Sequence, residues 1–282
     1  MSFADLHLHT NFSDGTYTPE ELVAHAARCK LAAISLTDHD TVEGCARAAA
    51  ACAAAGIEFI TGAELTTEQD DNELHMLAYF VDTSHERLLK ETGKFQIIRQ
   101  NRIHEMCTRL NELKIPLQAE AVFTLANCKS PGRPHVARAL VQAKLCSSLD
   151  EAFERFLKKG RPAWVPKAKM SAVDAIQLVH EAGGLAVMAH PGLNRNDDAI
   201  PALVEAGLDG IECFHTKHTT RMAERYLMIA DQHHLLVTGG SDCHGQSKGK
   251  PLIGTVKLPY QHVEKLKEKI GVRKSSATNG NE

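Results

Sequence analysis

The sequence predicts an α/β fold with a largely parallel sheet, either open or closed into a barrel. Short β-rich segments recur along the chain, and several are followed by amphipathic segments rich in Ala, Leu and Glu. A length of 282 residues is also routine for a single β/α barrel domain. We expect strands at residues 3–9, 32–38, 58–65, 73–80, 185–190, 210–214 and 235–241.

The first two strands are separated by a helix with a clear start. Thr18 is the predicted N-cap, Pro19 the first helical residue, and Glu21 completes a capping box. Residues 46–56 are rich in Ala and end at Gly56, so they predict the next helix. These elements begin the alternation of strands and helices.

Two stretches interrupt this alternation. Only ten residues separate Glu64 from His75, too few for a crossover helix, so we expect a hairpin that places the two side by side. Residues 84–169 contain no predicted strand, and we expect a helical insertion over the active-site end of the strands. Its predicted helices are 86–113, 119–126, 134–144 and 149–158. The barrel domain would comprise 1–83 and 170–272, and 273–282 would form a disordered tail.

The composition is that of an ordinary soluble globular protein, with 43% hydrophobic residues and a net charge of −3. No run of about 18 apolar residues predicts a membrane span, and the N-terminus lacks the features of a secretory signal. The eight cysteines form no C-x-x-C pair, which favours free thiols and a cytoplasmic location. The charge argues against a general polyanion-binding surface but allows a local basic pocket. No obligate protein partner is evident.

Metal-competent side chains gather at the predicted strand ends. His7 and His9 end the first strand, and their i, i+2 spacing directs both imidazoles to one face. Because loops at the carboxyl ends of strands build the sites of α/β sheets and barrels, these side chains should meet in one place. The nine candidate ligands are His7, His9, Asp14, His39, Glu64, His75, His190, Asp242 and His244.

Imidazoles and carboxylates without organised thiolates suit Zn, Mn or Fe. Nine candidates are too many for one four-coordinate ion, so we infer two or three ions with Glu64 as a natural bridge. His7 and His9 would share one ion, and Asp14 would serve another with His39 and His244. Such a cluster activates water and clamps the attacking and leaving oxygens, which suits phosphate ester hydrolysis.

Two acidic neighbours of His39 have alternative interpretations. Asp38 either is a metal ligand itself or orients His39 through a hydrogen bond without contacting the metal. Asp40 either is a metal ligand or caps the next helix. Both alternatives stay open at the level of sequence.

We expect Asp242, His190 and Glu64 to be the catalytic residues. His190 and His215 are candidates for the acid that protonates the leaving oxygen, but a metal-bound His190 cannot donate a proton. His215 and His218 lie near the end of the sixth strand as ligands, substrate contacts or surface residues. For these two histidines we favour a role other than metal ligand.

Six ordered motifs resemble those of the polymerase and histidinol phosphatase (PHP) superfamily. They are D-L-H-L-H-T followed by S-D-G, L-T-D-H-D, G-A-E, H-M-L-A-Y-F, A-H-P and S-D-C-H, and they run from residue 5 to residue 244. The resemblance implies a distorted seven-stranded β/α barrel that binds two or three divalent ions, with Mn as the first expectation and Fe or Zn as alternatives. It also implies ligand roles for all nine candidates.

Within the superfamily the chain is most similar to the bacterial TrpH/YciV type, through the tract T-N-F-S-D-G-T-Y-T-P and the G-R-P-H of the insertion. Such proteins are 3′,5′-nucleotide bisphosphate phosphatases that convert pAp-like compounds to AMP, and some also trim short RNAs from a 5′-monophosphate end. The resemblance therefore implies a small nucleotide substrate and, in addition, short RNA ends. A histidinol-phosphate type of phosphatase, a proofreading-type exonuclease module and a non-catalytic metal-binding regulatory domain are the alternatives.

A nucleotide bisphosphate presents one phosphate to the metals and a second that must be recognised elsewhere. The segment S-P-G-R-P-H in the insertion opens a predicted helix, and helix N-termini favour phosphate. Arg133 can bind such a phosphate with two hydrogen bonds. We therefore expect Arg133, His135, Ser130 and Lys169 to bind substrate, with Lys167 as a further candidate.

Overall fold

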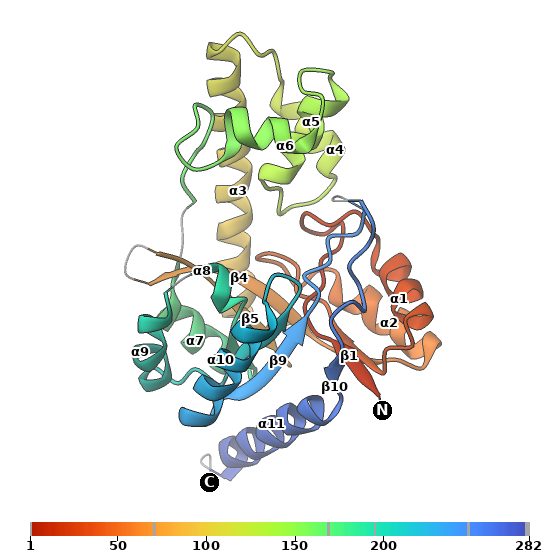
Figure 1. Ribbon diagram of the computed structural model, residues 1–282, viewed down its shortest axis with the longest axis vertical. Helices are drawn as coiled ribbons and strands as arrows, with labels where there is room; N and C mark the ends of the chain where they lie inside the picture. Colours follow the sequence, from red (N-terminus) through yellow and green to blue (C-terminus); the bar gives the residue numbers. More distant parts are fainter. Residues whose placement is uncertain (1, 70–71, 168–169, 195, 247–248, 280–282) are drawn as a thin grey trace.

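The computed structural model describes residues 2–69, 72–167, 170–194, 196–246 and 249–279. Its strands lie in two mixed sheets flanked by helices, so the α/β class is confirmed (Figure 1). The four-stranded sheet has the order β10 (Leu258–Pro259), β1 (Phe3–Asp5), β2 (Ala33–Ser35), β3 (Glu58–Ile60). The six-stranded sheet has the order β6 (Met170–Ser171), β4 (Gly62–Gln69), β5 (Asn72–Tyr79), β7 (Leu185–Met188), β8 (Gly210–His215), β9 (Leu236–Gly240).

The hairpin expected between Glu64 and His75 is present. Strands β4 and β5 pair antiparallel, with Thr66 opposite His75 and Glu64 opposite Leu77. Strand β5 then pairs antiparallel with β7, whereas β7, β8 and β9 run parallel to one another. The hairpin therefore interrupts an otherwise largely parallel arrangement, as the short connection predicted.

Continuous strand ladders do not close into a barrel within the described residues. Strands β1, β2 and β3 are each only three residues long, so their ladders end before a ring is complete. Shorter links nevertheless join the two sheets: the N–H of Leu6 donates to the carbonyl of Gly239 at 3.1 Å, and Leu8 bridges Cys243. A second isolated bridge joins His39 to Glu64. These links bring the edges of the two sheets together beside the candidate ligands.

Helices cover the outer faces of both sheets. Helix α1 (Pro19–Arg28) begins as predicted, because the side chains of Thr18 and Glu21 each accept a hydrogen bond from the other's backbone N–H. Helix α2 (Cys45–Ala55) ends at Gly56, whose φ of 68° is left-handed. The remaining helices of the body are α7 (Ala172–Glu181), α8 (Pro191–Asn194), a 3₁₀ turn (Asp197–Ala199), α9 (Ile200–Glu205) and α10 (Thr220–Gln232).

A helical unit is inserted in the chain between β5 and β6. Its hydrophobic core, which includes Ile103, Leu110, Val136, Leu140 and Phe156, is separate from the cores beside the sheets. Figure 1 shows the long helix α3 rising from the sheets and the smaller helices packed beside its far part. The elements are α3 (Glu86–Glu112), α4 (Ala119–Ala126), α5 (Arg133–Gln142), α6 (Leu149–Ala152) and a π-helical turn (Phe153–Leu157).

The C-terminal helix α11 (Gln261–Asn279) differs from the expected disordered tail beginning at residue 273. The helix continues to Asn279, and residues 280–282 lie outside the described residues. Upstream, Val263, Leu266 and Ile270 pack into the core under the sheet at helical spacing. Arg273 then pairs with Asp209, with Nη2 2.8 Å from Oδ1, and donates to the carbonyl of Gly184. These contacts extend the helix beyond its apolar part.

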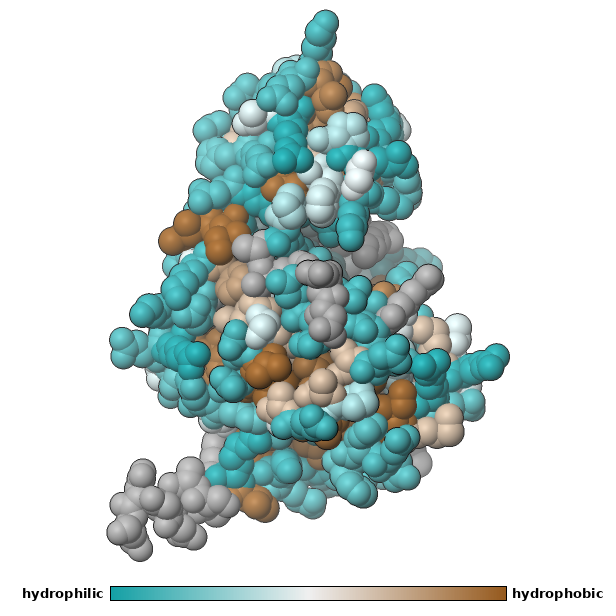
Figure 2. All heavy atoms as spheres, turned by 90° about the vertical axis from the view of Figure 1, so that its left-hand side faces the viewer, coloured by the Kyte–Doolittle hydropathy of each residue, from teal (hydrophilic) through white to brown (hydrophobic). Residues whose placement is uncertain are grey.

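The exposed surface on one side of the molecule is mainly hydrophilic. Figure 2 shows that its apolar side chains lie in separate groups rather than one continuous area. Within the described part of the chain, no helix is both long enough and apolar enough to cross a membrane. All eight cysteines are free.

Candidate metal centre

The structure brings the nine predicted ligand residues together at the ends of the strands. Each of the nine side chains is buried or partly buried. His7 and His9 follow β1, Asp14 lies in the loop before α1, and His39 follows β2. Glu64 and His75 lie in the β4–β5 hairpin, His190 follows β7, and Asp242 and His244 follow β9.

Glu64 lies in the middle of the centre. Its Oε2 is 3.0 Å from Nδ1 of His39 and 3.3 Å from Nε2 of His9. Its Oε1 is 2.6 Å from Nδ1 of His75 and 3.0 Å from Nε2 of His190. Burial raises the pKa of Glu64, but the imidazoles of His39 and His75 outweigh burial and hold this pKa well below its usual range. The ionised carboxylate thus presents one oxygen to the imidazoles of His39 and His9 and the other to the imidazoles of His75 and His190. A bridging ligand has this arrangement.

Asp242 faces the two histidines of the first strand. Its Oδ1 is 3.2 Å from Nε2 of His9 and 3.5 Å from Nε2 of His7. Burial lowers the pKa of His9, but the carboxylates of Asp242 and Glu64 outweigh burial and raise it to about 10. Asp242 has a left-handed φ of 52°, and its N–H donates to the carbonyl of His7 at 2.9 Å. The backbone of His7 therefore helps to hold this uncommon conformation.

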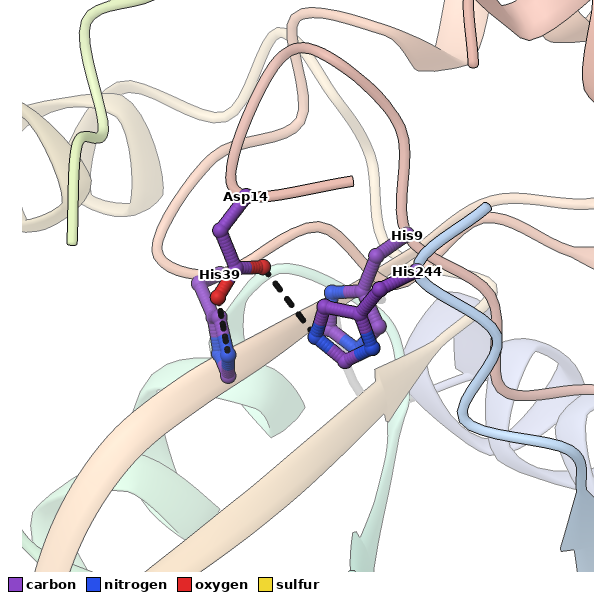
Figure 3. A group of neighbouring side chains, drawn as sticks. All are labelled: His9, Asp14, His39 and His244. Carbon is purple, nitrogen blue, oxygen red and sulfur yellow. Dashed lines mark ion pairs between the residues drawn. The ribbon is translucent and has the colours of Figure 1, made fainter. Parts of the chain in front are cut away.

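A further group consists of His9, Asp14, His39 and His244 (Figure 3). Oδ1 of Asp14 is 3.1 Å from Nε2 of His244, and its Oδ2 is 3.9 Å from Nε2 of His39. The rings of His9 and His244 stack with their centroids 4.1 Å apart. Burial lowers the pKa of His39 to about 4, against the opposing effect of Glu64 and Asp14. A neutral His39 can offer a lone pair to a metal ion.

Unpaired buried atoms show that this donor set fits divalent metal ions. Buried polar atoms are nearly always hydrogen-bonded, yet several atoms of the centre have no such partner among the described residues. They are Nε2 of His7, both ring nitrogens of His9, Oδ1 of Asp14, Nδ1 of His39, Oε2 of Glu64 and Nδ1 of His190. Within the described part of the chain, ligand atoms gather within 4.8 Å of one another in four groups: His9, Asp14, His39 and His244; His7, Glu64 and His190; His7, His9 and Asp242; His39, Glu64 and His75. Such nitrogen and oxygen donors suit Mn, Fe or Zn.

Glu212 is a residue of the centre that the sequence analysis missed. It lies in β8, with its Oε1 3.0 Å from Nδ1 of His7, and its Oε2 accepts from the N–H of His190 at 2.8 Å. A carboxylate on the outer nitrogen of a histidine fixes its tautomer and leaves Nε2 free for a metal. An available signal was the acidic residue between Ile211 and Cys213 in an apolar strand, because an acid that is fully buried usually has a partner.

Asp38 belongs to the loop scaffold and not to the groups of metal-competent atoms. Its carboxylate accepts hydrogen bonds from the backbone N–H of Thr10 at 2.7 Å and from the hydroxyls of Thr10 and Ser13 at 2.6 Å. It therefore holds the loop that leads to Asp14, and these hydrogen bonds do not involve His39.

Asp40 links the centre to the helical unit and does not cap the next helix, because the N-cap of α2 is Gly44. Its carboxylate accepts from the N–H of Thr66 at 2.8 Å and lies 2.7 Å from Nε of Arg99 in α3. The backbone N–H of Asp40 also donates to the carbonyl of Glu64 at 3.0 Å. Burial raises the pKa of Asp40, but Arg99 outweighs burial and holds it below its usual value.

His215 and His218 have different environments. The side chain of His215 is buried, and its Nε2 lies 3.4 Å from Oδ2 of Asp242. His218 Nδ1 lies 2.9 Å from the carbonyl of Cys213, and its Nε2 accepts from the N–H of Gly192 at 3.2 Å. His218 thus connects β8 to α8, while His215 faces the metal centre.

The predicted substrate residues of the insertion lie at the start of α5. The hydroxyl of Ser130 donates to the carbonyl of His39 at 2.6 Å, and this hydrogen bond connects the helical unit to the segment after β2. Nδ1 of His135 accepts from the N–H of Gly132 at 3.0 Å and shapes the turn before the helix. Of the three, Arg133 is placed at the edge of a pocket, where its guanidinium contacts the backbone of the same unit.

This cationic pocket lies beside the metal centre and has a volume of about 290 Å³. Nζ of Lys167 is 3.5 Å from Nε2 of His75 and 2.8 Å from Oε1 of Glu73. Burial lowers the pKa of Arg102 to about 9, and the neighbouring guanidinium of Arg133 acts in the same direction. Lys169, the other predicted substrate lysine, lies outside the described residues. The pocket is lined by Arg102, Arg133, Lys159 and Lys167, with Asn72, Glu73, Trp164 and Pro166.

Known proteins are similar to this chain in sequence and in architecture. The family model described as PHP domain matches residues 5–128. The chain is 32% identical over 247 residues to the 5′-3′ exoribonuclease Rnm of Escherichia coli strain K12, covering 85% of this chain and 84% of that protein. It is 32% identical over 273 residues to the 3′,5′-nucleoside bisphosphate phosphatase of Chromobacterium violaceum, covering 92% and 93%. A solved structure described as a metal-dependent phosphoesterase from Bifidobacterium adolescentis has a TM-score of 0.88 and 33% identity, covering 94% of this chain and 95% of that one.

Proposed function

Because this chain belongs to the PHP domain family of metal-dependent phosphoester hydrolases, we propose that it removes the 3′-phosphate of nucleoside 3′,5′-bisphosphates and so converts pAp to AMP. The observation that carries the proposal is the position of the cationic pocket, whose Lys167 lies 3.5 Å from the candidate ligand His75. A substrate with two phosphates matches this pairing, because one can lie at the metal centre while the other lies among the cations.

The proposed cofactors are two or three divalent ions, Mn in the first place and Fe or Zn as alternatives. Bound ions would lower the pKa of a water and offset the negative charge of the phosphoryl group. The distances support a division in which Glu64 is shared between ions, since its two oxygens face different imidazoles. The proposed ligand sets are His7, His9 and Asp242; Asp14, His39 and His244; and His75 and His190, with Glu64 shared between ions.

The protein's own side chains supply orientation and charge. Glu212 sets the tautomer of His7, so that Nε2 of His7 faces the centre. Arg133 and Lys167 both line the cationic pocket, which supports a role for them in binding the second phosphate through charge-assisted hydrogen bonds. Trp164, on the same pocket wall, offers an aromatic face to a nucleobase.

We also propose a distorted seven-stranded barrel, formed by residues 1–83 and 170–272, under a cap domain formed by residues 84–169. The links from Leu6 and Leu8 to the end of β9, together with the bridge between His39 and Glu64, support the barrel. The separate hydrophobic core of the helical unit supports the cap. The eight free cysteines support a cytoplasmic location.

A second activity, the trimming of short RNA from a 5′-monophosphate end, fits the same geometry. The first ribose of such an RNA carries a 5′-phosphate and a 3′-phosphodiester. The ribose of pAp likewise carries phosphorus groups at the 5′ and 3′ positions, both as monoesters. The cationic pocket could hold the 5′-phosphate of either molecule. The similarity to an exoribonuclease over 85% of this chain supports this activity.

Release of inorganic phosphate from pAp, adenosine 3′-monophosphate and an aryl phosphate in the presence of Mn²⁺ tests the proposal. One charged hydrogen bond contributes about 1.5–3 kcal/mol, so the second phosphate should raise kcat/KM for pAp over adenosine 3′-monophosphate by roughly 10–150-fold. Asp242→Ala should abolish turnover while the far-ultraviolet circular dichroism stays unchanged. Equal kcat/KM for adenosine 3′-monophosphate and pAp would contradict recognition of a second phosphate.

Arg133→Ala tests the cationic pocket itself. The loss should lower kcat/KM for pAp by roughly 10–100-fold and leave an aryl phosphate little affected, because only pAp carries a second phosphate. Arg161→Ala is the matched control, since Arg161 is an exposed arginine of the same unit that is not among the residues lining the pocket. Equal losses for both substrates would point to a structural role for Arg133.

A further inference from the structure

His215 lies in the metal centre but is not one of the nine ligand residues. Its side chain is fully buried, and Nε2 has no hydrogen-bond partner among the described residues. This atom lies 3.4 Å from Oδ2 of Asp242, and the ring centroid lies 5.5 Å from that of His190. A buried polar atom is normally paired, so this position calls for a specific role.

The backbone determines which ring nitrogen of His215 carries the proton. The N–H of Lys217 lies 3.1 Å from Nδ1 of His215 in hydrogen-bonding geometry. A backbone N–H can only donate, so Nδ1 is the acceptor. A neutral imidazole with an accepting Nδ1 carries its proton on Nε2. His215 therefore presents an N–H group, and not a lone pair, to Asp242.

His7 shows the opposite arrangement in the same centre. Its Nδ1 faces the carboxylate of Glu212 at 3.0 Å, which is an acceptor, so its Nε2 is left with a lone pair. The two histidines therefore present opposite hydrogen-bonding groups to Asp242: His7 a lone pair and His215 an N–H. His7 can bind a metal through the nitrogen that faces Asp242, whereas His215 can only donate a hydrogen bond there.

We propose that His215 is a positioning residue for Asp242 and acts through a hydrogen bond from its Nε2–H to Oδ2. This contact would leave Oδ1, the oxygen that faces His7 and His9, available for a metal ion. Reaching an ordinary N–H···O length from 3.4 Å requires a movement of roughly 0.3 Å. Asp242 lies in a loop after the end of β9 and has a left-handed φ, so it is outside the hydrogen-bonded ladder of that strand. A side-chain partner can therefore define the orientation of its carboxylate.

The proposal rests on the metal centre proposed above, so its test measures metal binding without any substrate. Metal-free protein is titrated with Mn²⁺ by calorimetry for the wild type, His215→Ala, His215→Gln and His104→Ala. His215→Ala should weaken binding by roughly 10–100-fold, as losses of such supporting contacts do. His215→Gln keeps an amide donor and should recover most of this affinity. His104 is an exposed histidine of α3, and its replacement should leave binding unchanged.

A second measurement separates positioning from direct action on the substrate. In an Asp242→Asn background, His215→Ala should cause no further loss of Mn²⁺ affinity, because its partner has already been altered. Unchanged Mn²⁺ affinity in His215→Ala, with or without a loss of kcat, would overturn the proposal. Equal impairment of the folded His215→Ala and His215→Gln proteins would overturn it as well. A wild-type protein that binds none of Mn²⁺, Fe²⁺ or Zn²⁺ would instead refute the metal centre itself.

Discussion

The ion pair between Asp40 and Arg99 makes the attachment of the helical unit measurable. The two side chains are only 1% and 9% exposed, so loss of one partner leaves the other charge poorly solvated. Asp40→Asn should therefore destabilise the protein by about 3–5 kcal/mol. Arg99→Met should destabilise the protein less, by about 2–3 kcal/mol, because Asp40 still accepts two hydrogen bonds from Thr66. The double variant should lose less unfolding free energy than the two single variants together, and the difference gives a coupling free energy of about 3 kcal/mol.

Urea unfolding provides the assay. The one tryptophan of the chain, Trp164, lies in the helical unit, so its fluorescence reports this unit, while circular dichroism reports the whole chain. The exposed pair Glu20–Arg47 is the control: its atoms are also 2.7 Å apart, but both side chains are 50% exposed, and its coupling should stay below about 1 kcal/mol. A coupling for Asp40 and Arg99 no larger than that of the control would refute the reasoning.

The same pair predicts how stability depends on pH. Burial raises the pKa of Asp40, but Arg99 outweighs it, so the folded-state pKa lies below the unfolded value of about 3.9. A depressed carboxyl pKa adds stability above the unfolded pKa, and this contribution is lost as the pH falls through the folded pKa. The stability difference between wild type and Asp40→Asn should therefore be constant near neutral pH and shrink below about pH 4.

Metal removal and two substitutions test the centre directly. At free Mn²⁺ of about 100 times Kd, binding stabilises the fold by about 2.7 kcal/mol, so chelation should lower Tm by about 5–10 °C; an unchanged Tm would contradict a built metal site. In Gly240→Ala the new Cβ would lie 2.3 Å from Cβ of His7, so we expect a loss of about 1–3 kcal/mol and of bound metal, measured by urea unfolding and elemental analysis. A fully metallated, equally stable Gly240→Ala protein would show that β1 can shift freely. Glu212→Gln should weaken Mn²⁺ binding by roughly 10–100-fold in calorimetry, and unchanged affinity would remove the role given to this carboxylate.

The gathering of the candidate ligands could be predicted because strand geometry alone determines it. The i, i+2 spacing of His7 and His9 places both on one face, and the short connection between Glu64 and His75 requires a hairpin. The capping box of α1 is equally local, since Thr18 and Glu21 are three residues apart. Features of this kind depend on a few neighbouring residues and on the parallel order of the strands.

Features that depend on distant contacts were not predictable from the sequence. Arg102 and Lys167 enter the same pocket from segments 65 residues apart (167 minus 102), and only the packing of the helical unit brings them together. Arg273, the first residue of the predicted tail, pairs with Asp209 across a separation of 64 residues, a contact that composition alone could not predict. Strand ladders only three residues long likewise carry too few pairing positions for a sequence pattern to define how the sheets close.

The helical unit leaves the body after β5 and returns at β6, and these two strands lie on either side of β4 in the same sheet. All nine candidate ligands are encoded outside residues 84–169, whereas Arg102, Arg133 and Lys167 are encoded within them. A recombination event that exchanged this one contiguous stretch of gene would therefore alter which molecules are captured without changing a single candidate metal ligand. Substrate selectivity and hydrolytic activity can thus evolve independently in this architecture.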